Sequence, residues 1–167
     1  MSKYIYGFIV LCVIGSTCQL SANQAPIVDA GPDQYVWLGN AGNPSTATVQ
    51  IDATVTDDGL PSDTLLYQWY TNNPGAVVMD PDDQEDLTAV ISGGAGTYSF
   101  QLLADDTDLI NTDIVQVLVA ETACQAAQAM PDYEPIPTDF NGDCIVNMED
   151  FALLALGWLE CNSLECP

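Results

Sequence analysis

Oxygen-bearing side chains alternate along a twelve-residue stretch near the C-terminus, residues 139–150, which reads Asp-Phe-Asn-Gly-Asp-Cys-Ile-Val-Asn-Met-Glu-Asp. Calcium takes about six to eight oxygen ligands, and a loop that supplies them from positions 1, 3, 5, 7, 9 and 12 curls round one ion. This stretch has a side-chain oxygen at each of those positions except position 7, where the backbone carbonyl serves. The spacing therefore predicts a calcium site with the ligands Asp139, Asn141, Asp143, the Ile145 carbonyl, Asn147 and Asp150.

Position 6 of such a loop normally holds glycine, because the backbone there has a positive φ, and this chain has Cys144 instead. A non-glycine residue in that conformation costs of order 1 kcal/mol. We expect a disulfide at Cys144 to hold the conformation. The alternative interpretation is an Asp/Asn-rich turn that caps the following helix without binding a metal.

The charge composition excludes several kinds of function. The chain has 167 residues with 24 Asp and Glu, one Lys or Arg and no His, and the one cation is Lys3. Nucleic-acid binding, Ser-His-Asp catalysis, Walker-type phosphate binding and His-based zinc sites are excluded, because each needs Lys, Arg or His. Carboxylates without cationic partners are solvated, hydrogen-bonded or bound to a metal. Apolar residues make up 48% of the chain, which is enough to build a core and argues against disorder.

Residues 1–22 have the pattern of an export signal, with Lys3, an apolar run over 4–14 and small residues up to Ala22. We predict cleavage after Ala22, so that the exported chain begins at Asn23 and is secreted or held at the cell surface. The apolar run is shorter than the roughly 20 residues of a membrane-spanning helix, so no membrane insertion is expected after removal of the signal. A retained N-terminal anchor and a lipoprotein processed at Cys18 are the alternatives.

Four cysteines remain after removal of the signal, and an even number in an exported chain predicts two disulfides. A helix over about 148–159 rises about 18 Å at about 1.5 Å per residue, whereas the Cα atoms of a disulfide lie about 4.4–6.8 Å apart. Cys144 and Cys161 stand at opposite ends of that helix and cannot pair, which also excludes the complementary pair Cys124–Cys166. A Cys144–Cys166 bond needs the last five residues to run back along the helix. We therefore predict Cys124–Cys144 and Cys161–Cys166.

Apolar and polar residues alternate in short runs between 26 and 120, a pattern of period two that is typical of strands with one buried face. Examples are 49–55, 65–69, 98–102 and 114–119. Clusters of Gly, Pro, Asn and Asp separate the runs. About seven short strands in about 95 residues predict an antiparallel immunoglobulin-like β-sandwich. Trp69 is predicted as a core residue between the sheets, and Tyr98 as a structural residue at a corner.

The chain divides into four predicted parts. They are the signal (1–22), the sandwich (25–120), a short helix with a Pro-rich linker (121–138), and the calcium loop, helix and Cys-containing tail (139–167). The short helix is expected over 124–130, where Pro131 stops it. The fold class is therefore mainly β, with a small C-terminal α-helical module that is EF-hand-like.

Two other acidic clusters are assigned to turns. Asp80, Asp82, Asp83, Glu85 and Asp86 lie in a Pro-containing loop whose spacing matches no calcium template, and we predict a solvated turn, with a calcium role as the alternative. Asp105, Asp106 and Asp108 are dense carboxylates near a strand end, and a strand-end turn explains them. They are also the residues on which a glycosidase with two carboxylates would depend.

The sandwich region resembles bacterial PKD-type repeats in three places: Asp-Ala-Gly-Pro-Asp-Gln (29–34), Leu-Leu-Tyr-Gln-Trp (65–69), and Gly-Thr-Tyr-Ser-Phe (96–100) leading to Asp105-Asp106. The resemblance covers nearly all of 25–120 and departs from the family pattern at 57–62. It implies an immunoglobulin-like sandwich that serves as a non-catalytic spacer or adhesion module of a secreted protein.

The C-terminal loop, with Asp150 at position 12 and the apolar run 151–156 after it, resembles one half of a type I dockerin. The resemblance implies folding that depends on calcium, held by the ligands named above, and attachment to a cohesin-like receptor. Dockerins usually carry two such halves, and this sequence shows one.

Two classes of function follow. The first is a secreted, non-catalytic adhesion or scaffold module, in which the uncharged Phe151–Leu159 helix contacts an extracellular or cell-surface protein. The alternatives are packing of that helix on the sandwich or on a second copy of the chain. The second class is an accessory or catalytic component of extracellular polysaccharide degradation, with a polysaccharide as partner. We expect the first class and no enzyme activity, because about 95 residues of sandwich leave little room for a substrate cleft.

Overall fold

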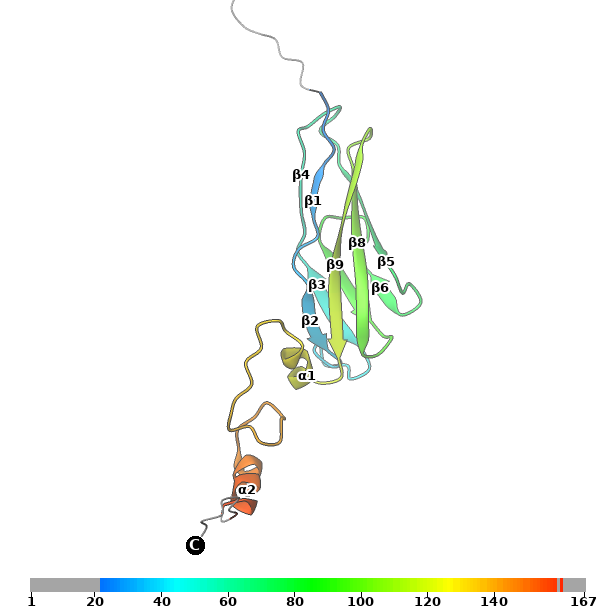
Figure 1. Cartoon of the computed structure of the whole chain (residues 1–167). Helices are drawn as coiled ribbons and strands as arrows, with labels where there is room; N and C mark the ends of the chain where they lie inside the picture. Colours follow the sequence, from blue (N-terminus) through cyan, green and yellow to red (C-terminus); the bar gives the residue numbers. More distant parts are fainter. Residues whose placement is uncertain (1–21, 159, 161–167) are drawn as a thin grey trace, which may run out of the picture.

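The structure is a computed structural model that describes residues 22–158 and residue 160. In this part of the chain nine strands precede two short helices, and the helices lie at one end of an elongated molecule (Figure 1). The strands are β1 (Ile27–Asp29), β2 (Gln34–Trp37), β3 (Ala47–Ile51), β4 (Thr54–Thr56), β5 (Leu66–Thr71), β6 (Val77–Met79), β7 (Leu87–Ile91), β8 (Gly96–Asp105) and β9 (Ile110–Ala120). The helices are α1 (Ala123–Gln128) and α2 (Met148–Leu156).

The strands form a four-stranded sheet in the order β2-β9-β8-β5, a three-stranded sheet in the order β3-β7-β6, and the separate pair β1-β4. Every pairing is antiparallel except that of β2 with β9, which is parallel and places Gln34 opposite Val117. The predicted immunoglobulin-like sandwich is confirmed. It differs from the expectation in its parallel pair and in having nine strands, because two short segments at its edge also pair.

The chain changes sheets between β1 and β2, at Gly31 and Pro32. Gly31 has φ +84°, and a Cβ atom there would lie 2.9 Å from the backbone carbonyl oxygen of Asp52, so the position requires glycine. Pro32 has no N–H with which to continue the pairing of β1. The break therefore allows β2 to leave β4 and run beside the last strand.

The inward side chains of β8 and β9 follow the predicted period of two and are at most 4% exposed. They are Tyr98, Phe100, Leu102, Val115, Val117 and Val119. Together with buried residues of the three-stranded sheet they form one apolar cluster. The core therefore lies between the two sheets.

Trp69 and Tyr98 take the structural roles expected from the sequence. Trp69 is 1% exposed, and its indole N–H donates to the backbone carbonyl oxygens of Gln84 (3.0 Å) and Glu85 (3.2 Å). The Tyr98 hydroxyl donates to the carbonyl oxygen of Gly94 at 3.0 Å. Both rings are buried while their polar atoms are paired, as aromatic core residues require.

The acidic loop around residues 80–86 is more than the solvated turn that the sequence predicts. The Glu85 carboxylate accepts a hydrogen bond from the N–H of Val55 (2.6 Å), and the Asp86 carboxylate accepts one from the N–H of Ala53 (3.2 Å). These carboxylates therefore pair the N–H group of one residue of β4 and that of the residue just before this strand. The prediction was incomplete because the contacts join residues about thirty positions apart.

Helix α1 confirms the short helix expected after the sandwich. The Thr122 side chain caps it by accepting the N–H of Gln125 at 3.2 Å. Ala126 is 3% exposed, and the helix packs against β2 and β9 at the end of the sandwich. The Pro-rich linker follows, and α2 lies beyond it, away from the sandwich (Figure 1).

Helix α2 ends at Leu156, three residues before the predicted end, because Gly157 forms its C-cap. In the described part of the chain, neither helix has the length and apolarity that crossing a membrane demands. The predicted signal segment up to Ser21 and the predicted Cys161–Cys166 disulfide lie outside the described residues, and both stay predictions.

Candidate metal centre

The carboxylate of Asp139, at loop position 1, organises the first half of the predicted calcium loop. Its Oδ1 accepts the backbone N–H groups of Gly142 (2.7 Å) and Asp143 (3.2 Å), and its Oδ2 accepts that of Cys144 (2.8 Å). Three successive N–H groups thus point back at one side chain. This single contact set curls the backbone from position 1 to position 6.

Positions 3 and 5 continue the curl by local hydrogen bonds. The Asn141 side-chain oxygen accepts the N–H of Asp143 (3.0 Å), and the Asp143 Oδ1 accepts the N–H of Ile145 (2.8 Å). The Asn141 amide nitrogen donates to the Asp143 Oδ2 at 2.9 Å. Short Asp and Asn side chains bond their own backbone two residues on, which is why alternating Asp and Asn form a turning loop rather than a helix or strand.

Asp150, at position 12, closes the loop and is 2% exposed. Its Oδ1 accepts the N–H groups of Phe140 (2.7 Å) and Asn141 (3.3 Å), and its Oδ2 accepts the N–H of Asn147 (2.8 Å). The Asn147 N–H lowers the pKa of the Asp150 carboxyl most, burial opposes this, and the N–H groups of Asn141 and Phe140 lower the pKa further. The net effect keeps Asp150 charged and ties the start of the loop to the start of α2.

Asn147, at position 9, also begins the helix. Its side-chain oxygen accepts the N–H of Glu149 at 2.6 Å, and with Asp150 it forms a capping box at the N-terminus of α2. The sequence analysis named both residues as metal ligands and gave a turn that caps the following helix as the alternative interpretation, and the capping is present. The acceptor residues at N-cap and three positions later were the signal that identifies it.

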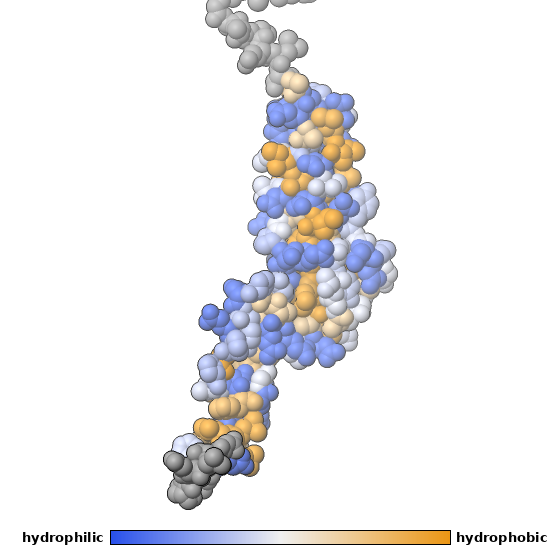
Figure 2. Space-filling view, in the orientation of Figure 1, coloured by the Kyte–Doolittle hydropathy of each residue, from blue (hydrophilic) through white to orange (hydrophobic). Residues whose placement is uncertain are grey.

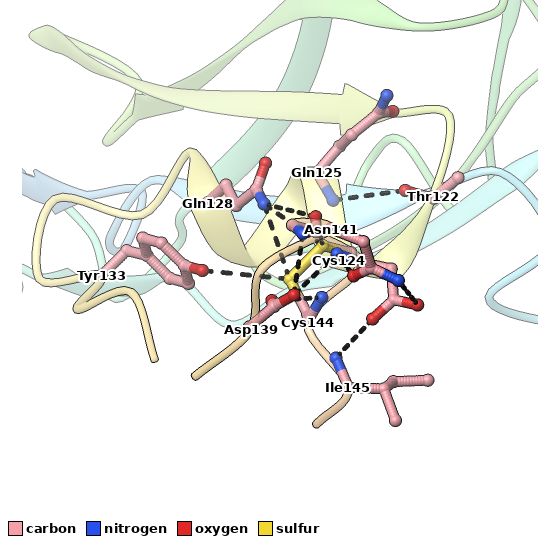
Figure 3. Close-up of a disulfide and its surroundings, with 11 residues drawn as sticks. Thr122, Cys124, Gln125, Gln128, Tyr133, Asp139, Asn141, Cys144 and Ile145 are labelled. Carbon is pink, nitrogen blue, oxygen red and sulfur yellow. Dashed lines mark hydrogen bonds between the residues drawn. A yellow bond between two sulfur atoms is a disulfide. The ribbon is translucent and has the colours of Figure 1, made fainter. Parts of the chain in front are cut away.

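The disulfide predicted between Cys124 and Cys144 is present, with Cα atoms 5.5 Å apart (Figure 3). Cys144 has φ 67°, the left-handed conformation expected at loop position 6. The disulfide joins the loop to α1 and so to the end of the sandwich. Two neighbours that the sequence analysis missed lie beside it. Gln128, one helical turn after Cys124, donates from Nε2 to the Gly142 carbonyl oxygen (3.2 Å), and the Tyr133 hydroxyl lies 3.9 Å from the Cys144 sulfur (Figure 3).

The structure places all six predicted ligand residues in one closed loop, but it does not gather the carboxylates of Asp139, Asp143 and Asp150 into one group. The carboxylates face backbone N–H groups, and among the described residues no three Asp, Glu, Cys or His side chains form a group that could hold a metal ion. Two features of the loop fit calcium. The backbone is left-handed at position 6, and every predicted ligand atom is an oxygen.

Comparison with known proteins gives similarities in structure. No protein-family model matches the chain, and no curated protein matches it. A nucleoside hydrolase-related hypothetical protein from Saccharophagus degradans, described as associated with carbohydrate metabolism, is 20% identical with a TM-score of 0.45, over 59% of this chain and 26% of that one. The PKD domain of human KIAA0319 is 19% identical with a TM-score of 0.40, over 63% of this chain and 91% of that domain. Titin domain M7 is 14% identical with a TM-score of 0.34, over 60% of this chain and 98% of that domain.

The match spans about a quarter of the first of these proteins. Each similarity is one of architecture, and nothing about the activity of this chain follows from it. The solved structures named above include a PKD domain, the family that the sandwich sequence resembles. A dockerin half is not shown by these comparisons.

Proposed function

We propose that this protein is an exported, non-catalytic adhesion or scaffold module that attaches to an extracellular or cell-surface protein through its C-terminal loop and helix when calcium is bound. The observation that carries the proposal is the closed path of residues 139–150. There the Asp139 carboxylate accepts three backbone N–H groups, and the Asp150 carboxylate joins both ends of the loop.

Calcium would be held by the side chains of Asp139, Asn141, Asp143, Asn147 and Asp150 and by the Ile145 carbonyl. It would supply the positive charge that this chain lacks, since Lys3 is the one Lys or Arg in the sequence and there is no His. The loop's own residues then determine the N-terminal end of α2, because Asn147 and Asp150 belong to both the loop and the capping box. Binding at the loop would therefore order the helix.

Helix α2 supports an attachment role because its apolar side chains face solvent. Phe151 is 55% exposed, Leu156 77% and Trp158, just after the helix, 68%. Figure 2 shows this hydrophobic surface at the end of the molecule away from the sandwich. A depression of about 180 Å³ between the loop and the helix is lined mainly by Phe140, Val146, Phe151 and Leu154. An apolar surface of this kind marks a contact site, and the sandwich does not cover it.

We propose no catalytic role, because the carboxylates near the strand end that would serve a hydrolase are used by the fold. The Asp105 carboxylate accepts the N–H of Thr107 (2.7 Å), and Asp106 Oδ1 accepts the N–H groups of Asp108 (2.9 Å) and Leu109 (2.7 Å). These are the contacts of the predicted strand-end turn. An accessory role in polysaccharide degradation stays the alternative to simple adhesion.

Hydrogen exchange measured by mass spectrometry on the exported chain tests the loop, since it reports on residues 139–150 separately from the sandwich. We expect calcium to increase protection of this segment, and Asp139→Ala and Asp143→Ala each to remove the increase. Asp132→Ala, at an exposed linker position, is the matched control and should behave as the unchanged protein. Equal protection with and without calcium would refute the proposed site.

Attachment is tested with an immobilised cohesin-like receptor, with calcium and with a chelator. We expect retention in calcium alone, and loss of retention in Leu153→Asp and Leu156→Asp without a change in the melting temperature of the sandwich. A lower melting temperature in these variants, with the unchanged protein a monomer that is not retained, would show that the helix is part of the folded core and contradict the attachment role.

A further inference from the structure

Asn141, at loop position 3, is followed by Gly142, and this is the one Asn-Gly pair in the sequence. An asparagine loses its side-chain amide when the backbone nitrogen of the next residue attacks the side-chain carbonyl carbon. Glycine favours this attack, because it has no Cβ to block the approach and its backbone turns freely. Asn141 is exposed, and a Cβ atom built on Gly142 would meet nothing within 4 Å. The pair is therefore open to water.

The closed loop occupies both groups that must react. The N–H of Gly142 donates to Asp139 Oδ1 at 2.7 Å, and the Asn141 side-chain oxygen accepts the N–H of Asp143 at 3.0 Å. The nitrogen must turn from Asp139 toward the Asn141 side chain before the new bond forms, and this breaks the first contact. The reaction therefore requires local opening of the loop, so that its rate depends on the fraction of time the loop is open.

The Asn141 amide also joins two carboxylates. Its nitrogen donates to Asp143 Oδ2 at 2.9 Å and to Glu149 Oε2 at 3.4 Å. An ionised carboxylate in its place could accept hydrogen bonds but not donate them. Loss of the amide would thus bring a third negative charge beside Asp143 and Glu149, and the sequence after Lys3 has no Lys, Arg or His to offset it. The closed loop would then need a cation from solution.

We propose that the Asn141-Gly142 pair is a site of self-modification that makes closure of the loop depend more strongly on calcium. The Gly142 nitrogen bonds to the side-chain carbonyl carbon of Asn141, its proton leaves with the amide group as ammonia, and a cyclic imide remains. Water then opens the imide. Attack of water on the side-chain carbonyl gives aspartate with an ordinary backbone, and attack on the backbone carbonyl gives isoaspartate, in which the chain runs through the side chain.

The two products act differently on the loop. Aspartate adds a carboxylate ligand at position 3, and the charge of the ligands is one of the features that tune calcium affinity. Isoaspartate adds one carbon to the backbone path, which shifts the N–H groups of Asp143 and Cys144 from the Asp139 carboxylate that they now contact. The effect on calcium rests on the proposed function, whereas the modification itself does not.

The first test follows the modification by peptide mapping with mass spectrometry, on the exported chain aged for weeks at neutral pH without calcium. We expect Asn141 to lose its amide before any other asparagine. Asp139→Ala, which frees the Gly142 nitrogen, should speed the loss severalfold, and Asp132→Ala, at an exposed linker position, is the matched control. Faster loss at Asn72 than at Asn141 would overturn the proposal. A slower reaction in Asp139→Ala would also overturn it, by showing that the closed loop promotes the attack.

Gly142→Ala tests the role of the glycine. A side chain on the attacking residue hinders the new bond, so loss of the amide should be at least about tenfold slower. The substitution also strains the loop, because Gly142 has φ +74°, and an open loop by itself would speed the reaction. Slower loss therefore assigns the chemistry to the Asn-Gly pair, and unchanged or faster loss would contradict it.

The second test asks what the product does to the loop, with Asn141→Asp as the ordinary product made by mutation. Without calcium, hydrogen-exchange protection over 139–150 should fall severalfold below that of the unchanged chain, because like charges then meet without a donor. Calcium should restore the protection in full, with severalfold higher affinity than for the unchanged chain. Asn141→Ala is the matched control, since it removes the same donor without adding a charge, and calcium should restore its protection less.

The outcomes separate this inference from the proposed function. Equal protection of Asn141→Asp and the unchanged chain without calcium would overturn the conversion. Calcium that protects the unchanged chain but not Asn141→Asp would overturn it as well, and the proposed function would stand. Calcium without effect on any of these chains would refute the calcium loop together with the conversion, while the peptide mapping still decides whether Asn141 is modified.

Discussion

Cys144 allows the backbone requirement of the loop to be separated from the effect of the disulfide. The bond to Cys124 closes a segment with a sequence separation of 20, and a loop of that size is stabilised by about 3 kcal/mol in the chain-entropy description. Cys144 also has φ 67°, which costs a non-glycine residue about 1–2 kcal/mol. We compare Cys124→Ser with Cys144→Ser against Cys124→Ser with Cys144→Gly.

Both double variants lose the disulfide, and only the second relieves the backbone. The serine variant should lose about 3 kcal/mol of local stability, which is about a hundredfold in hydrogen-exchange protection over 139–150. The glycine variant should recover about 1 kcal/mol of this, about fivefold in protection. The sandwich should melt at the same temperature in both, because its core residues do not include the loop.

The measurement is hydrogen exchange of the calcium-free chains at one pH, with residues 96–105 of β8 as the internal reference. Equal protection of the serine and glycine variants would refute the claim that a left-handed position 6 limits the stability of the loop. Unchanged protection after loss of the disulfide would show that the carboxylates of Asp139 and Asp150 hold the loop without it.

Three further predictions concern single residues. The pKa of Asp150 is lowered on folding, so its contribution to the stability of the loop and α2 is complete above the ordinary Asp pKa of about 3.9 and is lost as pH falls through the lower folded pKa. Hydrogen-exchange protection of α2, measured from pH 6 downward, should therefore be level to about pH 4 and then decline. A decline that begins at higher pH would contradict this. Trp69→Phe keeps a buried ring but leaves two carbonyl oxygens without their donor, so the free energy of unfolding by urea should fall by about 1–3 kcal/mol; a loss below the error of the fit would count against it. Gly31→Ala should lower the same quantity by at least about 1–2 kcal/mol, because its φ is +84° and its Cβ meets the Asp52 carbonyl; equal stability would show that the turn rearranges.

Much of the sandwich could be predicted from local patterns. The alternation in 98–102 requires one buried face, and Tyr98, Phe100 and Leu102 are buried in the structure. The Cys124–Cys144 pair also followed from local geometry, because the helix that follows Cys144 holds it apart from Cys161 and so favours Cys124 as its partner. The end of α2 was predicted three residues too late, since the apolar run continues past Gly157 while the helix ends there.

The carboxylates show where sequence reasoning was incomplete. Asp106 was assigned to a strand-end turn, and its Oδ1 does accept N–H groups of that turn. Its Oδ2 is buried and has no partner among the described residues, and no local sequence pattern predicts that. Likewise Glu85 and Asp86 were expected in solvent, and they instead pair N–H groups of β4 and of the residue just before it.

The sequence by itself determined the elements whose cause is local. Period-two alternation makes the strands, Asp and Asn at alternate positions turn the chain at 139–150, and the absence of cations after Lys3 leaves oxygen and backbone N–H as the partners available to its carboxylates. Only the tertiary structure decided which distant donors and acceptors meet. Asn23 reaches Asp108 across 85 residues, and its neighbour Gln24 reaches Asp58 across 34, because β1 pairs with β4 and the turn between β8 and β9 closes over the same end. That pairing depends on the packing of the whole core between the sheets, which no single segment specifies.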